Sequence, residues 1–395
     1  MLLSLLLLAP AASQAAEPTL LVGTTSGATA SSAAPGARLA PGIRAVRGGA
    51  ATARRLRRLP GVRWVEPNRR FTASSVAAPT DPLFGRQWAL RSARVPGAWA
   101  TAIGGDVTVA VVDSGIDLSN PDLGENLWAN AGEIAGNGVD DDANGFVDDV
   151  HGADTVSHDG DPADGLGHGT AVASLIGARG DNGLGITGVA WRLRLMPVKV
   201  LHDRGWGTTV TLITGLRYAL ANGARIINLS VNGTEPSQAL EEAIRQAEAQ
   251  GALVVTSAGN DGQDRDQIAS YPASIDSPAV LTVTSTTRSG ALGSDSAYGP
   301  ASVDIAAPGE AVITGDLNGG FRTQSGTSFA AAYVSGAAAL LAAARPSATG
   351  TQLRKALVRS ARRGGRVDRW IAGGRLDVSA ALKRLKRARS GSRSR

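Results

Sequence analysis

The sequence predicts an α/β fold in which a three-layer parallel β-sheet carries helices on both faces, preceded by a small α+β module. From Asp106 onward, short apolar and β-branched segments recur, as expected of strands buried on both faces; they span 107–112, 195–200, 226–229, 253–256 and 280–283. Helical patterns follow these strands or lie between them, at 169–178, 208–222, 236–250 and 328–344. Such alternation is typical of a parallel sheet.

The region before this alternation is basic and only weakly apolar. Residues 17–80 contain ten Arg and two Glu. An Arg-rich helical pattern ends at Pro60 and Gly61, and a short strand follows it. We therefore expect residues 16–78 to form a separate module of marginal stability, which a linker joins to the rest of the chain.

The first residues have the pattern of an export signal. Residues 2–8 read Leu-Leu-Ser-Leu-Leu-Leu-Leu, and small residues follow them. We expect a secretory signal peptide at 1–15 and a secreted protein, extracellular or periplasmic; a buried N-terminal strand or helix is the alternative. The apolar run is too short to span a bilayer, and we expect no membrane span elsewhere in the chain.

Composition narrows the function further. The chain has no Cys, which excludes disulfides and thiol nucleophiles. Residues 81–350 hold 15 basic and 30 acidic side chains, whereas 352–395 hold 15 basic and two acidic ones. An acidic centre favours bound cations over nucleic acid. We expect 383–395 to form a disordered, solvated basic tail; contact with an anionic surface or nucleic acid is the alternative.

Four polar residues stand where a predicted strand ends or a predicted helix begins. Asp113 and Asn260 each follow a buried strand, His168 opens a helix between two glycines, and Ser328 opens a long Ala-rich helix. Taken singly, each is more often a cap, a turn residue or a structural histidine. In parallel sheets, however, functional groups gather at the carboxyl ends of the strands.

Together these side chains suit acyl transfer. A serine hydroxyl needs an adjacent base to become a nucleophile, and an imidazole can take and return its proton near neutral pH. A buried carboxylate orients that imidazole, and an amide donor stabilises the oxyanion that forms. The helix N-terminus beside Ser328 also favours developing negative charge.

The motifs around these residues resemble those of the subtilisin-type serine proteases, the subtilases. They are Asp-Ser-Gly at 113–115, His-Gly-Thr at 168–170, Ala-Gly-Asn at 258–260 and Gly-Thr-Ser at 326–328, in the family's order. The resemblance implies a peptidase domain over 79–382. It makes Asp113 the orienting acid, His168 the general base, Ser328 the nucleophile and Asn260 the oxyanion donor.

The resemblance also implies a groove for an extended peptide substrate. Its residues are Ser230, Val231, Asn232, Ala258 and Gly259. Asn232 stands where the family commonly has Gly, and we expect its side chain to reshape the nearest subsites. Residues 271–273 resemble a wall of the primary specificity pocket. An acid at Asp261 favours basic substrate side chains there.

Two calcium sites are expected. An acidic loop matches most of an EF-hand-like pattern of oxygen ligands; these are Asp140, Asp142, Asn144 and Asp148. His151 stands where the pattern has a Glu at the end of the loop, so we expect Asp149 to supply the missing ligand. A solvated acidic loop is the alternative. The resemblance implies a second site at Asp81, Asp122 and Asn182. Calcium would then stabilise a protein without disulfides.

The sequence thus predicts a secreted, calcium-stabilised serine endopeptidase, made as a self-processing precursor and acting as a monomer on polypeptide substrates. The segment 62–68 resembles part of the family's propeptide, an inhibitor and folding aid, so the protein's own propeptide is an expected partner. A permanently attached N-terminal domain is the alternative for that module. Rival functions are a peptide ligase or cyclase that uses the same triad and a non-catalytic peptide-binding module.

Overall fold

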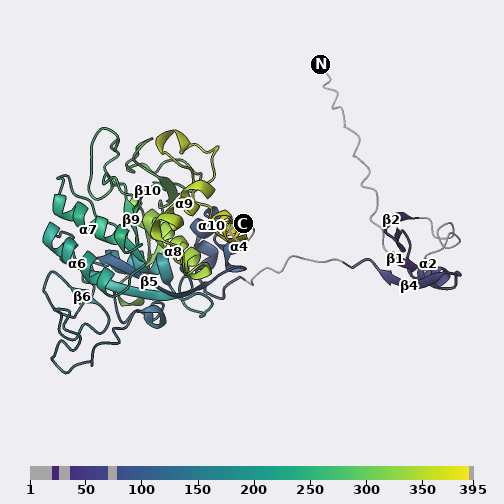
Figure 1. The fold of residues 1–395 in the computed structure, drawn as a ribbon, viewed down its shortest axis with the longest axis horizontal. Helices are drawn as coiled ribbons and strands as arrows, with labels where there is room; N and C mark the ends of the chain where they lie inside the picture. The colour runs from purple at the N-terminus through teal and green to yellow at the C-terminus, as the bar shows by residue number, and fades with distance from the viewer. Residues whose placement is uncertain (1–19, 26–35, 70–77, 391–395) are drawn as a thin grey trace, which may run out of the picture. The chain divides into compact units, whose positions relative to one another are not determined.

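The computed structural model describes residues 20–25, 36–69 and 78–390 of the chain. The chain divides into two compact units, Met1–Ser74 and Ser75–Arg395, shown in Figure 1. The expected signal peptide at 1–15 lies outside the described residues.

The first unit is a small antiparallel sheet with one helix. Its four strands pair in the order β2-β3-β1-β4, with bounds β1 Leu20–Thr24, β2 Ala37–Ala40, β3 Ile43–Val46 and β4 Val62–Pro67. Helix α2, Ala50–Arg57, buries Ala53 and Leu56, which belong to a small core with four strand residues. The predicted helix and following strand are confirmed, although the helix ends before Pro60.

The second unit is built on a seven-stranded parallel sheet in the order β11-β10-β9-β8-β5-β7-β6. The strands are β5 Gly104–Asp113, β6 Ala153–Asp154, β7 Arg192–Lys199, β8 Ile226–Leu229, β9 Leu253–Ser257, β10 Val280–Thr286 and β11 Ile305–Pro308. The predicted fold class is confirmed. The five predicted strands are all present, and β6 and β11 extend the sheet at its two edges.

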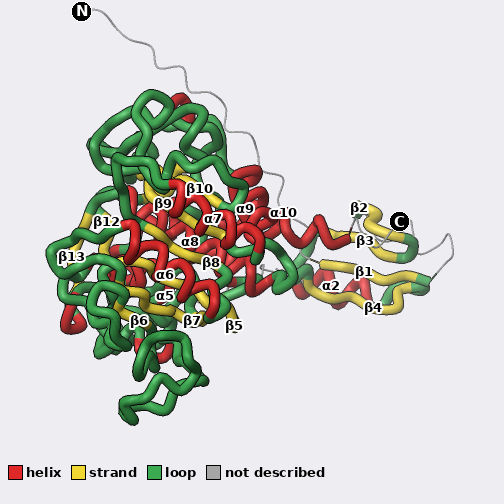
Figure 2. Tube along the Cα trace, turned by 60° about the vertical axis from the view of Figure 1, so that its left-hand side comes forward, coloured by secondary structure: helices red, strands yellow, loops and turns green. Residues whose placement is uncertain are grey.

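Helices cover both faces of this sheet (Figure 2). The long ones are α5 His168–Gly177, α6 Thr209–Ala221, α7 Gln238–Ala249, α8 Thr327–Ala344, α9 Gly350–Ser360 and α10 Val378–Ser390; α3 Trp88–Ser92 and α4 Pro96–Trp99 are short. A hairpin, β12 Val312–Gly315 with β13 Phe321–Gln324, precedes α8.

The two cores follow from the alternation of side chains along each strand. In β5, Val109 and Val111 pack with α5 and α8, whereas Ala110 and Val112 pack with α6 and α7. Because both faces are covered, most residues of these strands are buried, which explains the apolar runs in the sequence.

Helix α8 occupies the centre of one of these cores. Its residues from Thr327 to Ala342 are all buried. It is the one helix among the described residues long and apolar enough to cross a bilayer, and 89% of that stretch is buried inside the protein. Its apolar character therefore has an explanation in packing within the fold.

The expectation of a disordered tail from Lys383 is wrong up to Ser390. Helix α10 continues to that residue, and Ala381, Leu382 and Leu385 are buried in the core. Apolar residues three and four apart place a stripe on one helix face, so the helix packs although its other face is basic. Residues 391–395 lie outside the described residues.

Candidate active site

Asp113 is the last residue of β5 and is fully buried. Its Oδ1 accepts hydrogen bonds from the Ser114 amide at 2.8 Å and from Nδ1 of His168 at 2.6 Å. Its Oδ2 is buried and has no hydrogen-bond partner among the described residues. The end of a buried strand thus holds this carboxylate at one position, as the sequence predicts.

His168 is the first residue of α5 and lines a cleft of about 820 Å³. Burial alone lowers the pKa of the imidazole, but the adjacent Asp113 carboxylate and, more weakly, Asp164 outweigh that effect. The pKa of His168 is therefore raised above its ordinary value. An imidazole held in this way binds a proton more readily, which suits a general base.

Asp164 was not singled out from the sequence, yet it fixes the turn that leads into α5. The buried carboxylate accepts five hydrogen bonds: from Ser114 Oγ (2.9 Å), Leu166 N (2.9 Å), Gly167 N (2.8 Å), Thr170 N (2.9 Å) and Thr170 Oγ1 (2.6 Å). An Asp four residues before the helix start was the available signal, because acidic side chains commonly satisfy the free N–H groups there.

Ser328 lies in the first turn of α8, behind Gly326, whose φ of 154° is poorly tolerated by residues with a side chain. It lines the same cleft as His168, and the next residue, Phe329, has its ring 5.9 Å from the imidazole. Among the hydrogen bonds of the described residues, none joins the Ser328 hydroxyl to the imidazole. Such catalytic contacts are often long without substrate and shorten when it binds.

Asn260 follows β9 and also lines the cleft. Its Oδ1 accepts hydrogen bonds from the amide and the hydroxyl of Thr327, at 2.8 and 2.9 Å. These contacts fix the orientation of the carboxamide beside the start of α8. They leave the amide nitrogen as the end that can donate to a group bound in the cleft.

Some of the residues expected to bind substrate line the cleft. Ser230, Val231 and Asn232 line the cleft, together with Tyr271. Ala258 and Gly259 are buried, and neither is among the cleft-lining residues. Of the five residues expected to bind substrate, three are therefore accessible from the cleft and two are covered.

Asp261 is not a free charge. Its Oδ1 accepts a hydrogen bond from the buried guanidinium of Arg265. Burial raises the pKa of Asp261, but the Arg265 hydrogen bond and the Gln263 amide outweigh it, so the pKa is lowered. Because Arg265 neutralises this carboxylate, the expected preference for basic substrate side chains loses its physical basis.

The calcium ligands expected at Asp81, Asp122 and Asn182 lie close to one another. Asn182 Nδ2 donates to Asp122 Oδ1 at 3.0 Å, and Asp81 Oδ2 accepts from the Asp181 amide at 2.8 Å. Burial raises the pKa of both Asp81 and Asp122, and the charge of Asp81 raises that of Asp122 further. Asp81 Oδ1 is buried without a hydrogen-bond partner among the described residues. Neighbouring buried carboxylates with an unsatisfied oxygen fit a bound cation.

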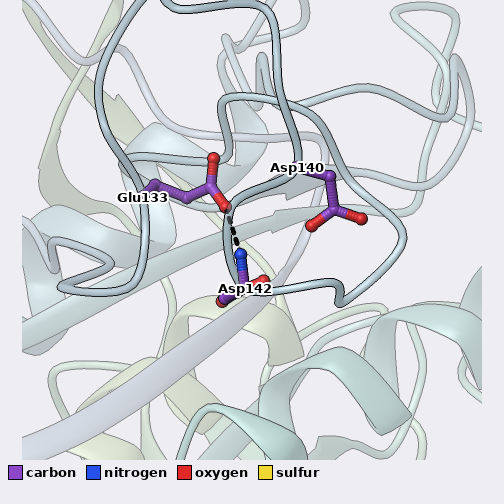
Figure 3. A group of neighbouring side chains, drawn as sticks. All are labelled: Glu133, Asp140 and Asp142. Atoms are coloured by element: carbon purple, nitrogen blue, oxygen red, sulfur yellow. Dashed lines mark hydrogen bonds between the residues drawn. The ribbon is translucent and has the colours of Figure 1, made fainter.

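In the acidic loop, the structure groups a different set of residues from the expected one. Glu133, Asp140 and Asp142 offer oxygens that all lie within 4.8 Å of one another, as Figure 3 shows. Glu133 was missed, because it precedes the loop in which ligands were sought. Asn144 Nδ2 instead donates to Asp149 at 3.0 Å.

Asp148 and Asp149 have other partners. Asp148 accepts from the amides of Asn137 and Gly138, at 3.1 and 3.0 Å. Asp149 is fully buried and accepts hydrogen bonds from three side chains, those of Asn130, Asn144 and Tyr218. Both carboxylates thus stabilise the loop itself in this structure.

Comparison with known proteins agrees with this geometry. Subtilisin-like protease 1 of Plasmodium vivax is 40% identical over 137 residues, which are 34% of this chain and 22% of that protein. Thermitase of Thermoactinomyces vulgaris is 34% identical over 167 residues, which are 42% of this chain and 52% of that protein. The chain thus matches only part of the length of these curated relatives.

A solved structure and a family profile extend the match. A protease from Pseudoalteromonas arctica has a TM-score of 0.66 and 27% identity, covering 78% of this chain and 100% of that one. A sequence profile described as the Subtilase family matches residues 104–377, which are most of the chain. By this match, the chain belongs to the subtilase family.

Proposed function

We propose that the protein is a serine endopeptidase that cleaves polypeptides through an acyl-enzyme. The observation that carries the proposal is the contact between Asp113 and His168, 2.6 Å long, in a cleft that Ser328 and Asn260 also line. Membership of the subtilase family supports the same chemistry.

In the proposed reaction, Ser328 Oγ attacks the carbonyl carbon of the substrate, and its proton passes to Nε2 of His168. The oxyanion accepts hydrogen bonds from Asn260 Nδ2 and a backbone amide at the start of α8. The imidazolium then protonates the departing amine, which leaves an ester on Ser328. A water molecule, deprotonated by His168, hydrolyses this ester and restores the hydroxyl.

The decisive experiment compares the purified protein with its Ser328→Ala variant on casein in calcium-containing buffer. We expect new amino termini from the wild type and a loss of about 10⁶-fold in rate in the variant, because the nucleophile is gone. Equal activity in the two proteins would contradict the proposal. Ligated instead of hydrolysed products would identify a ligase or cyclase, and no products would favour a peptide-binding module.

We further propose that the protein is exported and made as a self-processing precursor. The apolar segment at 2–8 and the basic composition of 17–80 support this proposal, as does the compact unit that ends at Ser74. Cleavage after about residue 78 would separate the propeptide from the peptidase domain. Mass spectrometry of the secreted wild-type and Ser328→Ala proteins tests this: only the wild type should lose the N-terminal unit.

Calcium is the proposed structural cofactor. Asp81, Asp122 and Asn182 would hold one ion, and Glu133, Asp140 and Asp142 a second. When bound, calcium would neutralise carboxylates that otherwise repel one another and so stabilise the folded state. We propose no role for either ion in the chemical step. The protein is proposed to act as a monomer.

A further inference from the structure

The positions of Ser328 and Asn260 determine where the substrate side chain next to the scissile bond must lie. This inference rests on the proposed function. Ser328 and Asn260 fix the carbonyl carbon under attack, and the side chain in question branches from the adjacent carbon. We therefore expect it to enter the cleft beside these two residues, near 230–233, which follow β8, and 257–260, which begin at the last residue of β9.

These segments meet a third segment, 270–272, whose Tyr271 also lines the cleft. Gly233 and Tyr271 exchange two backbone hydrogen bonds: the Gly233 amide donates at 2.7 Å and the Tyr271 amide at 2.8 Å. The segment 230–233 is thus fastened to 270–272, and 257–260 lies alongside. A space between these segments would be the pocket for a long side chain.

The side chain of Asn232 bridges these segments. Its Nδ2 donates to the Ser257 carbonyl at 3.2 Å and to Ser270 Oγ at 3.3 Å. Its Oδ1 accepts from Ser257 Oγ at 3.0 Å. The carboxamide thus spans from the end of β9 to the third segment, and both of its N–H groups are used.

Burial along the cleft agrees with this blockage. Ser257 and Ala258 have no exposed surface, and neither lines the cleft, whereas Asn232 is exposed and does line it. The surface that an incoming side chain meets is therefore Asn232 itself. The end of β9 lies behind it.

The covered segment 257–259 is also fixed from the side that faces away from Asn232. Arg265 Nε donates to the Ala258 carbonyl at 2.7 Å, and its Nη1 donates to the Ile268 carbonyl at 3.2 Å. A Cβ placed on Gly259 would lie 2.4 Å from Nη2 of the same guanidinium. Because this side is filled, the wall has no room to retreat when a large substrate side chain arrives.

We propose that Asn232 determines specificity by closing the primary side-chain pocket, so that cleavage follows residues with small side chains: Gly, Ala or Ser. Larger side chains would have to displace the carboxamide and break its three hydrogen bonds. The loss of those bonds falls on the transition state as well as on binding, so the preference appears in kcat/KM.

The test uses peptide nitroanilides that differ only in the residue before the scissile bond: Ala, Ser, Leu or Phe. For the wild-type protein in calcium, we expect kcat/KM for Ala to exceed that for Phe by about tenfold or more. Asn232→Gly removes the blocking group and should raise the Phe-to-Ala ratio by about tenfold or more. Asn232→Ser, of intermediate size, should give an intermediate ratio.

Asn222→Gly is the matched control. Asn222 caps the C-terminus of α6, where Gly is well tolerated, and this variant should keep the wild-type ratio. A wild-type preference for Phe or Leu, or an unchanged ratio in a folded Asn232→Gly, overturns the proposal. If that variant fails to fold, the wild-type ratio alone decides. A wild type that cleaves no peptide and does not react with an organophosphate at Ser328 overturns the proposed function too.

Discussion

At the scale of single residues, Asp164 shows how much of the candidate site depends on a side chain that does not line the cleft. It joins the residue after Asp113 to the first turn of α5, through Ser114 and Thr170. Its charge also contributes to the raised pKa of His168. One buried carboxylate therefore fixes both the position of the imidazole and part of its basicity.

Asp164→Asn is expected to reduce kcat/KM by about ten- to a hundredfold, because a misplaced imidazole loses alignment with the nucleophile. His168 must be neutral to accept a proton, so activity falls as the pH drops through its raised pKa. Removing the negative charge at 164 lowers that pKa, which moves the acidic limb of the pH–rate profile to lower pH. Steady-state kinetics across the acidic range measure both effects.

Asp161→Asn, in the same loop but exposed, is the control for that experiment. It should leave the position of the acidic limb unchanged. An Asp164→Asn protein with the wild-type profile and rate would show that Asp164 has no part in positioning His168.

The sequence was sufficient to find the four residues of the proposed mechanism and insufficient to find their supports. Asp113, His168, Asn260 and Ser328 stand beside regular elements, where local patterns fix their surroundings. Asp164, Glu133 and Arg265 act through loops whose paths depend on long-range contacts, so neighbouring residues gave little sign of their roles. The hydrogen-bond partners of Asp148 and Asp149 could not be predicted for the same reason, since residues adjacent in a loop can point to different partners.

At the scale of secondary structure, burial decided what could be predicted. Strands β5 and β7 to β10 are central, and their apolar runs were recognised. Strand β6 has two residues, too few for a periodic signal, and β11 reads Ile-Ala-Ala-Pro, which contains only one β-branched residue. Helix α10 was misjudged because the composition of its basic face was weighed above the spacing of Leu382 and Leu385 on the other face.

Helix α10 therefore offers a direct test of packing. Leu385→Ala should lower the free energy of unfolding by roughly 2–5 kcal/mol, the usual cost of removing a buried leucine side chain. Lys386→Ala, on the exposed face, should change it by less than about 0.5 kcal/mol. Urea denaturation of protein inactivated at Ser328 measures both without self-digestion. Equal effects would mean that the helix does not pack on the core.

At the scale of the whole molecule, acidic side chains are concentrated in residues 81–350. The acidic side chains of 81–350 include two groups with the chemistry of calcium ligands, and the chain has no disulfide to stabilise it. A cation that binds only the folded protein at a hundredfold excess over its Kd adds about 2.7 kcal/mol of stability. Chelation should therefore lower the melting temperature of the wild type.

Asp81→Asn should have opposite effects in the two buffers. The raised pKa of Asp81 means that its charge destabilises the metal-free fold at neutral pH, and Asn keeps the acceptor for the Asp181 amide. In EDTA the variant should melt at or above the wild-type temperature; in calcium it should melt below it. Scanning calorimetry in both buffers checks this.

Asp276→Asn, an exposed substitution outside both clusters, should show the full wild-type response to calcium. A wild type whose melting temperature does not respond to EDTA would refute the proposed stabilisation. So would an Asp81→Asn variant that keeps the whole response.

The burial of α8 has a consequence for how the protein fails on heating. Ser328 is carried by the helix around which one core is assembled. The proposed nucleophile is therefore part of that packed interior. Thermal inactivation and melting of the domain should consequently coincide. We expect no folded but inactive population in which the Ser328 hydroxyl alone is displaced.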